Sequence, residues 1–498
     1  MKCDLRGGHC LRARLLITAA SVALAGGVLS ACSSTTPSSA SAAKSTSTTA
    51  ARARYQGKLT LEPANGTPGT VVKVAGTGFP AGEAVQVAWQ NVTGSWKVTS
   101  SGELLGASYS SSYKPLASAT TSPTGSLFTS FVVPTGFGYS HEVQVNAGSQ
   151  TLNAATFKVA PQASISPQSG PAGTPIQVTL TGVGWQEYQQ NWYLMYDQHV
   201  TGWLSAVTTK GTATAVIPAT GTPGLHVLSI YEAPDREPYL NTQQTPTKNP
   251  MFTMKFTVTP GNAVLPPSTQ LQSSTPVAAA TPASVANGPA ISLNYSSGPP
   301  GTPLVLKGSG FPKDQQVKLT WVTQTGNHLY GMGGSASSLP SVTTAADGSF
   351  QTSFNTPSDL GESHKITAQA GSTSASTTFT ITPKDLGISP SSGPVGTEIT
   401  VHLQGTGVTW TSNIYGVTYD NSDIGYACGV NSNGDITLHL QATGAPGWHY
   451  IDFYPAVWNI VNMQFSTADY IQVPQLTYAA DHPGEKLSAF EFAFYISN

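Results

Sequence analysis

The sequence is poor in charge, and this shortage excludes several classes of protein. Charged residues make up only 9% of the 498 residues, and the formal net charge is −2. Binding to nucleic acid needs a basic face, so we expect no nucleic-acid partner. Helices on a protein surface usually carry many Lys, Glu and Arg residues, so the low charge also disfavours a helical fold.

Cysteine is scarce too, which excludes a disulfide framework. The four cysteines are Cys3, Cys10, Cys32 and Cys428. The first two lie in a segment that we expect to be removed, and Cys32 has a separate role described below. Cys428 is then left alone, and we expect it to be a small, partly buried apolar residue.

Turn-forming residues are abundant instead. The chain contains 50 glycines and 36 prolines with many Ser and Thr residues, a composition typical of short strands joined by turns. Apolar residues make up 39% and fall into alternating runs, which argues against disorder along the whole chain. At 498 residues the chain is too long for one core, so we predict an all-β protein of several domains.

The amino terminus has the pattern of an export signal. Its basic n-region contains Lys2, Arg6, Arg12 and Arg14. Residues 15–29 form an apolar h-region that is too short to span a bilayer comfortably. The run ends in Leu29-Ser-Ala-Cys32, which resembles the lipobox of bacterial lipoproteins.

The lipobox resemblance implies that Cys32 is diacylated and becomes the first residue of the mature chain. The acyl chains would hold the protein at a membrane, so we expect an extracytoplasmic lipoprotein anchored at the cell surface. Residues 1–32 are then the lipoprotein signal peptide, and the Ser/Thr-rich residues 33–57 form a flexible tether. The alternative is an ordinary secretory signal whose cleavage site happens to include a cysteine.

Four turn motifs repeat along the rest of the chain. They are Asn65-Gly-Thr-Pro-Gly-Thr70, Ser169-Gly-Pro-Ala-Gly-Thr174, Ser297-Gly-Pro-Pro-Gly-Thr302 and Ser392-Gly-Pro-Val-Gly-Thr397. Pro and Gly make a tight turn, and the β-branched Thr is expected to open the next strand. An alternating strand follows each motif and ends at a Gly-x-Gly bend. Because a second strand follows instead of a helix, these bends do not indicate a dinucleotide site.

The repeats come in pairs, which we call A–B and A′–B′. His226 and His449 both follow a Pro-Gly-x sequence and are separated by 223 residues, and the same spacing separates His141 from His364. This regularity indicates tandem duplication of a two-domain unit. The expected domains are residues 58–160 (A), 161–260 (B), 290–384 (A′) and 385–498 (B′), with a Pro-, Ala-, Ser- and Thr-rich linker at 261–289.

The turn motif, the strand and a following Gly-x-Gly-Phe, as in Gly76-Thr-Gly-Phe79 and Gly308-Ser-Gly-Phe311, resemble the IPT/TIG family of immunoglobulin-like domains. The B units depart from the pattern, with Gly184-Trp185 and Gly407-Val408 in place of Gly-Phe. The resemblance implies four immunoglobulin-like β-sandwich domains in two tandem pairs joined by a flexible linker. Domains of this class serve many binding and spacer roles.

No pattern of catalytic residues accompanies these domains. The GxSxG elbow and the HExxH motif are absent, and the neighbouring Ser140 and His141 point to opposite faces of a strand. One histidine per domain cannot bind a metal without partners, and we expect each to bond to a nearby loop carbonyl. The oxygen-rich runs 420–423 and 431–435 lack EF-hand spacing and are interpreted as turns. We therefore expect no enzyme activity, no cofactor and no metal.

Aromatic residues crowd the B units and supply the candidate binding residues. Trp185, Tyr188 and Trp192 follow the first bend, and Trp410 follows the second. Some must lie in the core, because a large aromatic side chain usually packs between the two sheets of a sandwich. Those left exposed would contact a ligand or a protein.

Two functions stay open at this point. The first is a non-catalytic surface lipoprotein whose domains act as adhesion, interaction or spacer modules toward an unknown protein or glycan partner. The alternative is a carbohydrate- or solute-binding lipoprotein that uses exposed aromatic loops of the B-type domains. Binding to glycans would separate the two hypotheses.

Overall fold

Most of the described chain is β-strand. The computed structural model describes residues 57–99, 104–186, 189–233, 238–244, 248–266, 275–280, 288–327, 331–407, 414–457, 473–484 and 489–498. Turns join the strands, and the 3₁₀ helix η2 (Val430–Ser432) lies between two of them. No helix within these ranges is long and apolar enough to cross a bilayer.

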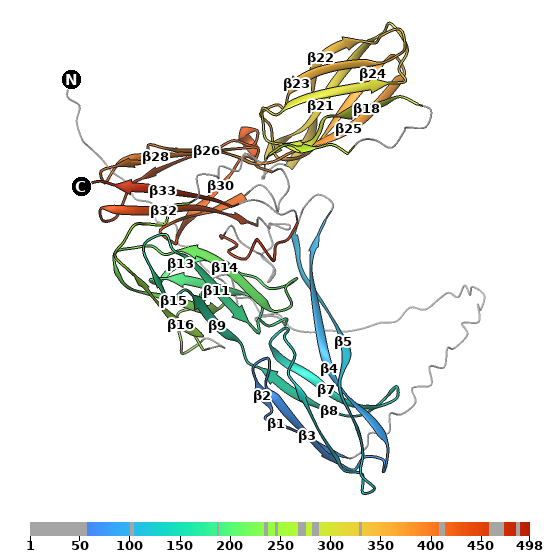
Figure 1. The fold of residues 1–498 in the computed structure, drawn as a ribbon, viewed down its shortest axis with the longest axis vertical. Helices are drawn as coiled ribbons and strands as arrows, with labels where there is room; N and C mark the ends of the chain where they lie inside the picture. The colour runs from blue at the N-terminus through green and yellow to red at the C-terminus, as the bar shows by residue number, and fades with distance from the viewer. Residues whose placement is uncertain are drawn as a thin grey trace, which may run out of the picture. The chain divides into compact units, whose positions relative to one another are not determined.

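Domain A is a sandwich of two sheets (Figure 1). The three-stranded sheet has the order β1-β3-β6, and the five-stranded sheet has the order β2-β8-β7-β4-β5. The strands are β1 (Lys58–Glu62), β2 (Asn65–Gly66), β3 (Val71–Thr77), β4 (Ala84–Val98), β5 (Leu104–Thr120), β6 (Leu127–Val132), β7 (Tyr139–Ala147) and β8 (Gln150–Val159).

Domains B and B′ repeat this plan, with sheets β14-β11-β9 and β10-β16-β15-β12-β13 in B and sheets β26-β28-β31 and β27-β33-β32-β29-β30 in B′. The strands of B are β9 (Gln162–Ser166), β10 (Ser169–Gly170), β11 (Pro175–Thr181), β12 (Trp192–Tyr196), β13 (His199–Leu204), β14 (Thr212–Pro218), β15 (Gly224–Glu232) and β16 (Phe252–Val258). Those of B′ are β26 (Lys384–Ser389), β27 (Ser392–Gly393), β28 (Glu398–Gln404), β29 (Ile414–Tyr419), β30 (Ser422–Cys428), β31 (Ile436–Gln441), β32 (Gly447–Ala456) and β33 (Phe490–Ile496).

Domain A′ has sheets β18-β20-β23 and β17-β19-β25-β24-β21-β22. Its strands are β17 (Val277–Ala278), β18 (Ala290–Leu293), β19 (Tyr295–Gly298), β20 (Pro303–Ser309), β21 (Gln316–Asn327), β22 (Gly331–Thr343), β23 (Phe350–Asn355), β24 (Glu362–Ala370) and β25 (Thr373–Ile381). The strand β17 lies within the segment that the sequence assigns to the linker, and it pairs with β19 at the edge of the larger sheet.

In every domain the chain crosses between the two sheets directly after its opening strand. The short strands β2, β10, β19 and β27 pair in parallel with the closing strands β8, β16, β25 and β33. The remaining pairs are antiparallel, which together with the crossing gives the arrangement of an immunoglobulin-like sandwich. The predicted all-β, immunoglobulin-like fold is confirmed.

The repeated turn motif makes this crossing. Its first two residues pair in parallel with the closing strand, and the next full strand starts one residue after the Thr. The Thr does not open that strand as expected. Its hydroxyl instead donates to the Pro carbonyl three residues earlier, at 2.7 Å for Thr174 and 2.7 Å for Thr302, so the Thr closes the turn.

Equivalent tryptophans lie in the cores of A and A′. Trp89 in β4 and Trp321 in β21 are 4% and 0% exposed, and each stacks on a histidine, His141 or His364, with ring centroids 4.7 Å apart. The Nε2 atoms of His141 and His364 lie 2.8 and 2.7 Å from the carbonyl oxygen four residues earlier. The predicted histidine–carbonyl bond is confirmed in both domains.

Both tandem pairs share one junction. The N–H of Gly138 in A donates to the Val183 carbonyl in B at 2.9 Å, and a Cβ on Gly138 would lie 1.8 Å from the carbonyl oxygen of Gly182. Gly361 and Gly405 repeat the contact between A′ and B′, where the corresponding distance is 2.5 Å. Since a methyl group would collide with backbone at both places, the close approach requires glycine.

We expect Gly138→Ala to lower the melting temperature of the protein, because its methyl group would overlap the Gly182 carbonyl and cost about 1–3 kcal/mol. Gly136→Ala is the matched control, since a Cβ at that position meets nothing within 4 Å. Scanning calorimetry of the full chain measures both. Equal melting temperatures for the two variants would contradict the close packing at the junction.

Candidate functional site

The structure places two of the five residues singled out from the sequence. Cys32, Tyr188 and Trp410 lie outside the described residues. Trp185 follows the Gly-x-Gly bend of domain B and is half-buried. Trp192 opens β12 and is 0% exposed, so its interpretation as a ligand contact is wrong.

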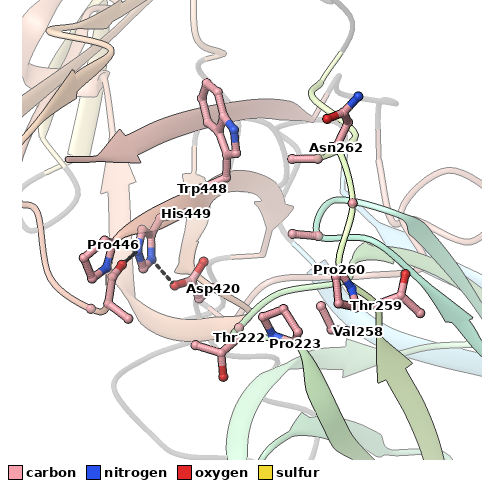
Figure 2. A pocket seen from close by; sticks show the side chains of 17 residues that line it. Thr222, Pro223, Val258, Thr259, Pro260, Asn262, Asp420, Pro446, Trp448 and His449 are labelled. Carbon is pink, nitrogen blue, oxygen red and sulfur yellow. Dashed lines mark hydrogen bonds and ion pairs between the residues drawn. The ribbon is translucent and has the colours of Figure 1, made fainter. Parts of the chain in front are cut away.

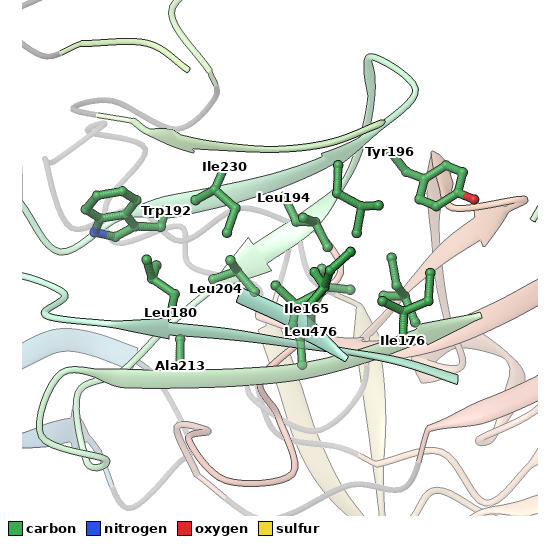
Figure 3. Packing of buried hydrophobic residues seen from close by; sticks show 14 of the residues in the cluster. Ile165, Ile176, Leu180, Trp192, Leu194, Tyr196, Leu204, Ala213, Ile230 and Leu476 are labelled. Atoms are coloured by element: carbon green, nitrogen blue, oxygen red, sulfur yellow. The ribbon is translucent and has the colours of Figure 1, made fainter. Parts of the chain in front are cut away.

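Trp192 belongs to the core of domain B because of the alternation in β12. Trp192, Leu194 and Tyr196 point between the two sheets, where they pack against side chains that include Ile176 and Leu180 of β11 (Figure 3). The indole N–H of Trp192 donates to the Gln189 carbonyl at 3.1 Å. The ring therefore packs inside the domain, and its N–H has a hydrogen-bond acceptor there.

The opposite face of β12 is buried as well, which the sequence did not predict. All five residues of the strand are buried, although alternation directs Tyr193 away from the core of B. Tyr193 lies in a separate cluster with Trp203 of β13, Leu104 of domain A, and Val457 and Val473 of domain B′. Domains A and B′ therefore cover this face of B.

Residues 473–484 of domain B′ lie along the edge of the larger sheet of B, and we call them the covering segment. The N–H of Trp203 donates to the Pro474 carbonyl at 2.8 Å, and the N–H of Leu476 donates to the Trp203 carbonyl at 2.9 Å. This parallel contact extends the sheet beyond its edge strand β13. An open edge invites pairing with other chains, and here the same chain closes it.

Asp481 fixes the end of the covering segment. Its carboxylate is 0% exposed and accepts hydrogen bonds from the N–H of Val207 at 2.8 Å and the N–H of Thr208 at 2.9 Å. The Thr208 hydroxyl donates at 2.6 Å, and the indole N–H of Trp96 in the β4–β5 hairpin of domain A donates at 3.0 Å. One buried anion thus joins A, B and B′ through four donors.

Domains B and B′ each contain a histidine–aspartate pair at the same place. Nδ1 of His226 lies 2.5 Å from Oδ2 of Asp197, and Nδ1 of His449 lies 2.5 Å from Oδ2 of Asp420. In both histidines Nε2 lies 2.8 Å from the carbonyl oxygen four residues earlier. The predicted carbonyl bond is confirmed, and the aspartate is a partner that the sequence pattern did not reveal.

The loop before each of these histidines requires glycine. Gly221 and Gly444 have φ values of +95° and +120°, and a Cβ there would lie 2.5 and 2.4 Å from the Cε1 atom of the histidine. Asp420 also accepts a hydrogen bond from the N–H of Tyr450 at 3.0 Å. Burial lowers the pKa of His449, but the hydrogen bond and charge of Asp420 outweigh it, so the pKa is raised.

The turns of B and B′ meet around a cleft of about 610 Å³ (Figure 2). Domain B contributes residues 221–223 and 258–260, the start of the linker contributes residues 261–263, and domain B′ contributes Asp420 and residues 444–449. Trp448, in the last of these ranges, is not among the residues inferred from the sequence. Its place one residue before a buried histidine indicates that it points outward, and this signal could have identified it.

Asn421 ties the two sides of the cleft together. It follows Asp420 in the turn between β29 and β30, and both residues have positive φ. The turn predicted at 420–423 is therefore confirmed at 420–421, whereas residues 422 and 423 begin β30. The buried side-chain amide of Asn421 donates to the Pro218 carbonyl at 2.8 Å and to the Thr220 hydroxyl at 3.1 Å. Residues adjacent to the two walls of the cleft are therefore hydrogen-bonded to each other.

Asp452 is a buried acid that faces away from the core of B′. It is 1% exposed, and neither carboxylate oxygen has a hydrogen-bond partner of normal geometry in the part of the chain that the structure describes. The hydroxyl of Thr418, its neighbour in β29, is likewise buried and unpaired within that part. Burial, together with the charges of Glu491 and Asp420, raises the pKa of Asp452 well above its usual range.

Other reactive side chains are sparse. Cys428 is half-buried with a free thiol, as expected, and burial raises its pKa. Among the residues that the structure describes, no group of three or more His, Cys, Asp or Glu side chains could hold a metal ion.

No family model matches the chain, and no curated protein sequence matches it. Solved structures similar to it include invasin, a bacterial integrin-binding protein, at 11% identity over 88% of this chain and 79% of that chain, with a TM-score of 0.18. A D1–D4 ectodomain fragment of ICAM-5 is similar at 12% identity over 89% of this chain and 100% of that chain, with a TM-score of 0.17.

A Salmonella alpha-2-macroglobulin mutant is similar at 11% identity over 87% of this chain, with a TM-score of 0.18, and the match covers 30% of that protein's length. Such low TM-scores carry no argument about function. The assignment of immunoglobulin-like sandwiches rests on the strand pairing of this chain.

We expect Asp481→Ala to loosen the contacts among A, B and B′, because it leaves four donors without their acceptor. Each buried group left unsatisfied costs about 1–3 kcal/mol. Hydrogen–deuterium exchange should become faster at residues 205–208. Asp347→Ala is the control, because that carboxylate lies in an exposed turn of A′ and bonds to Ser349. Unchanged exchange at 205–208 in Asp481→Ala would rule out the joining role.

Asp452→Asn should change how stability depends on pH. A carboxyl group with a raised pKa binds its proton more tightly in the folded chain, so its stabilising contribution is present below the unfolded pKa of about 4 and is lost as the pH rises. The Asn variant cannot ionise, so it should lose less stability than the wild type between pH 4 and 7, by about 1 kcal/mol or more. Urea unfolding at both pH values measures this. Parallel pH profiles for the two proteins would contradict it.

Proposed function

We propose that this chain is a bacterial lipoprotein, anchored to a membrane outside the cytoplasm, that acts by binding and not by catalysis. Its domains, of the IPT/TIG type, would serve as adhesion, interaction or spacer modules at the cell surface. The observation that carries the proposal is the order along the chain: a lipobox ending at Cys32, a polar tether at 33–57, and then the sandwiches.

The close contacts between the domains support the proposal that the chain acts by binding. Glycine junctions repeat in both tandem pairs, at Gly138 and Gly361, and Asp481 joins A, B and B′ through buried hydrogen bonds. A surface whose parts are ordered before binding loses less conformational entropy when a partner arrives. Such a surface suits recognition of a protein or glycan.

The alternative function, carbohydrate binding through the aromatic loops of the B-type domains, has weaker support at those loops. Trp192 lies in the core, and Trp185 is half-buried with its indole N–H enclosed and unpaired among the described residues. A different place, the cleft beside Trp448, favours a carbohydrate ligand more strongly and is treated below.

Acylation of Cys32 predicts that the protein incorporates labelled palmitate and partitions into detergent. Two acyl chains give stable membrane retention, whereas an unmodified polar tether has no membrane affinity of its own. Cys32→Ser should therefore lose the label and move to the aqueous phase, with an unchanged far-ultraviolet circular dichroism spectrum. Cys428→Ser is the matched control and should keep the label. Wild-type protein recovered unlabelled in the medium would overturn the lipid anchor and leave the fold unaffected.

A further inference from the structure

We propose that the cleft between the turns of B and B′ binds a neutral saccharide, with Trp448 as its stacking surface. This deepens the binding function proposed above and rests on it, since it names a ligand class for one surface of the scaffold. The cleft, at about 610 Å³, lies within the range of roughly 300–1,000 Å³ that small-molecule sites usually enclose.

Trp448 is the aromatic wall of this cleft. It lies in β32 opposite Tyr495 of β33, and the two rings meet edge to face with centroids 5.2 Å apart. Trp448 is half-buried and Tyr495 is 41% exposed, so the pair forms an accessible aromatic surface. The apolar C–H face of a sugar ring packs well on such a surface, which is large and stays in place on binding.

The indole N–H of Trp448 also has no hydrogen-bond partner in the part of the chain that the structure describes, although it lies at a cleft lined by polar groups. An indole N–H can only donate, so a ligand there needs an acceptor next to its apolar face. A sugar hydroxyl meets this need.

Further polar groups lie on the other side. Asn262, in the chain leaving β16, is exposed and lies across from Trp448 (Figure 2). The backbone N–H groups of residues 261–263 make no hydrogen bond with other described residues and can donate to a ligand. Asp420 keeps lone pairs that can accept from hydroxyl groups. A polyol, which both donates and accepts, matches this mixture.

The charge of the cleft favours a neutral ligand. Asp420 and His449 are the ionisable side chains among the described residues that line it, and they pair with each other at 2.5 Å. Because these two side chains bond to each other, the cleft presents neither the cationic cluster that phosphate needs nor an unpaired acid for a cation.

The duplication shows that the aromatic pair is not needed by the fold. In domain B the same strand position holds Leu225, which pairs with Thr257 and is 59% exposed. Domain B nevertheless keeps the turn, the histidine and the aspartate. The Trp448 ring at the cleft and the Tyr495 ring against it are therefore additions in B′, which a binding role explains and a folding role does not.

Isothermal titration of the full chain, in a detergent without a sugar headgroup, tests the proposal. The probes are maltotriose, cellotriose, mannotriose and triacetylchitotriose, with glucose 1-phosphate as the charged comparison. We expect at least one neutral trisaccharide to bind and Trp448→Ala to weaken its binding more than 10-fold. Trp448→Phe should retain part of the affinity, and Leu225→Ala, the matched position in B, should leave it unchanged.

Several outcomes would overturn this site. They are no binding of any neutral probe, equal binding by Trp448→Ala, and tighter binding of glucose 1-phosphate than of the neutral sugars. Saturable binding of a peptide in the cleft with no sugar binding would reassign it to protein recognition. Failure here would leave palmitate labelling at Cys32 intact, so it is distinguishable from failure of the lipoprotein proposal. If Trp448→Ala unfolds, the question is decided with Trp448→Phe. Adding the sugar should change the tryptophan fluorescence of the wild type, and Trp448→Phe should lose that change.

Discussion

The buried carboxylate of Asp481 is the contact on which the association of A, B and B′ depends. None of its four hydrogen-bond donors is a cation: two backbone N–H groups, a hydroxyl and an indole N–H surround it. Such bonds are strongly directional, and the loss of water around the anion strengthens them. The donors therefore fix where the covering segment ends, and with it which face of B is closed.

Closing that face changes what the B domain can do. The edge strand β13 would otherwise present unpaired backbone groups, and Tyr193 and Trp203 would form an apolar patch. The covering segment removes both features from the surface. The turns at the cleft, where Asp420 and Trp448 lie, are not covered by this segment, and they are the surface proposed for recognition.

The fold could be predicted from the sequence because the residues that determine it lie close together along the chain. Each turn motif contains the residues that cross between the sheets, and its bonds span three residues, as between Thr174 and Pro171. The equivalence of Trp89 and Trp321 likewise follows from duplicated spacing, and both are core residues. The role of the Thr hydroxyl was not predicted. Thr is favoured in a strand by its β-branching and at the end of a turn by its hydroxyl, so the residue type does not distinguish these neighbouring positions.

The site was less predictable because its determinants are distant in sequence. Aromatic density around Trp192 gives the number of rings but not their direction, and both faces of β12 are covered by residues far along the chain. Alternation next to His449 could have directed Trp448 outward. The opposite wall of its cleft comes from the chain leaving β16, almost two hundred residues earlier, and no local pattern links the two.

The parallel pairing of the short strand β2 with the closing strand β8 has a mechanical consequence. In domain A the N–H groups of Lys158 and Ala160 donate to the carbonyls of Ala64 and Gly66 at 3.0 and 2.8 Å, across strands that run in the same direction. Tension applied through the two ends of such a domain pulls these strands past each other, so both bonds carry the load together and do not open one after the other. Resistance to forced unfolding is set by the rate of this step. Such a domain therefore resists unfolding most strongly when the force acts between its two ends.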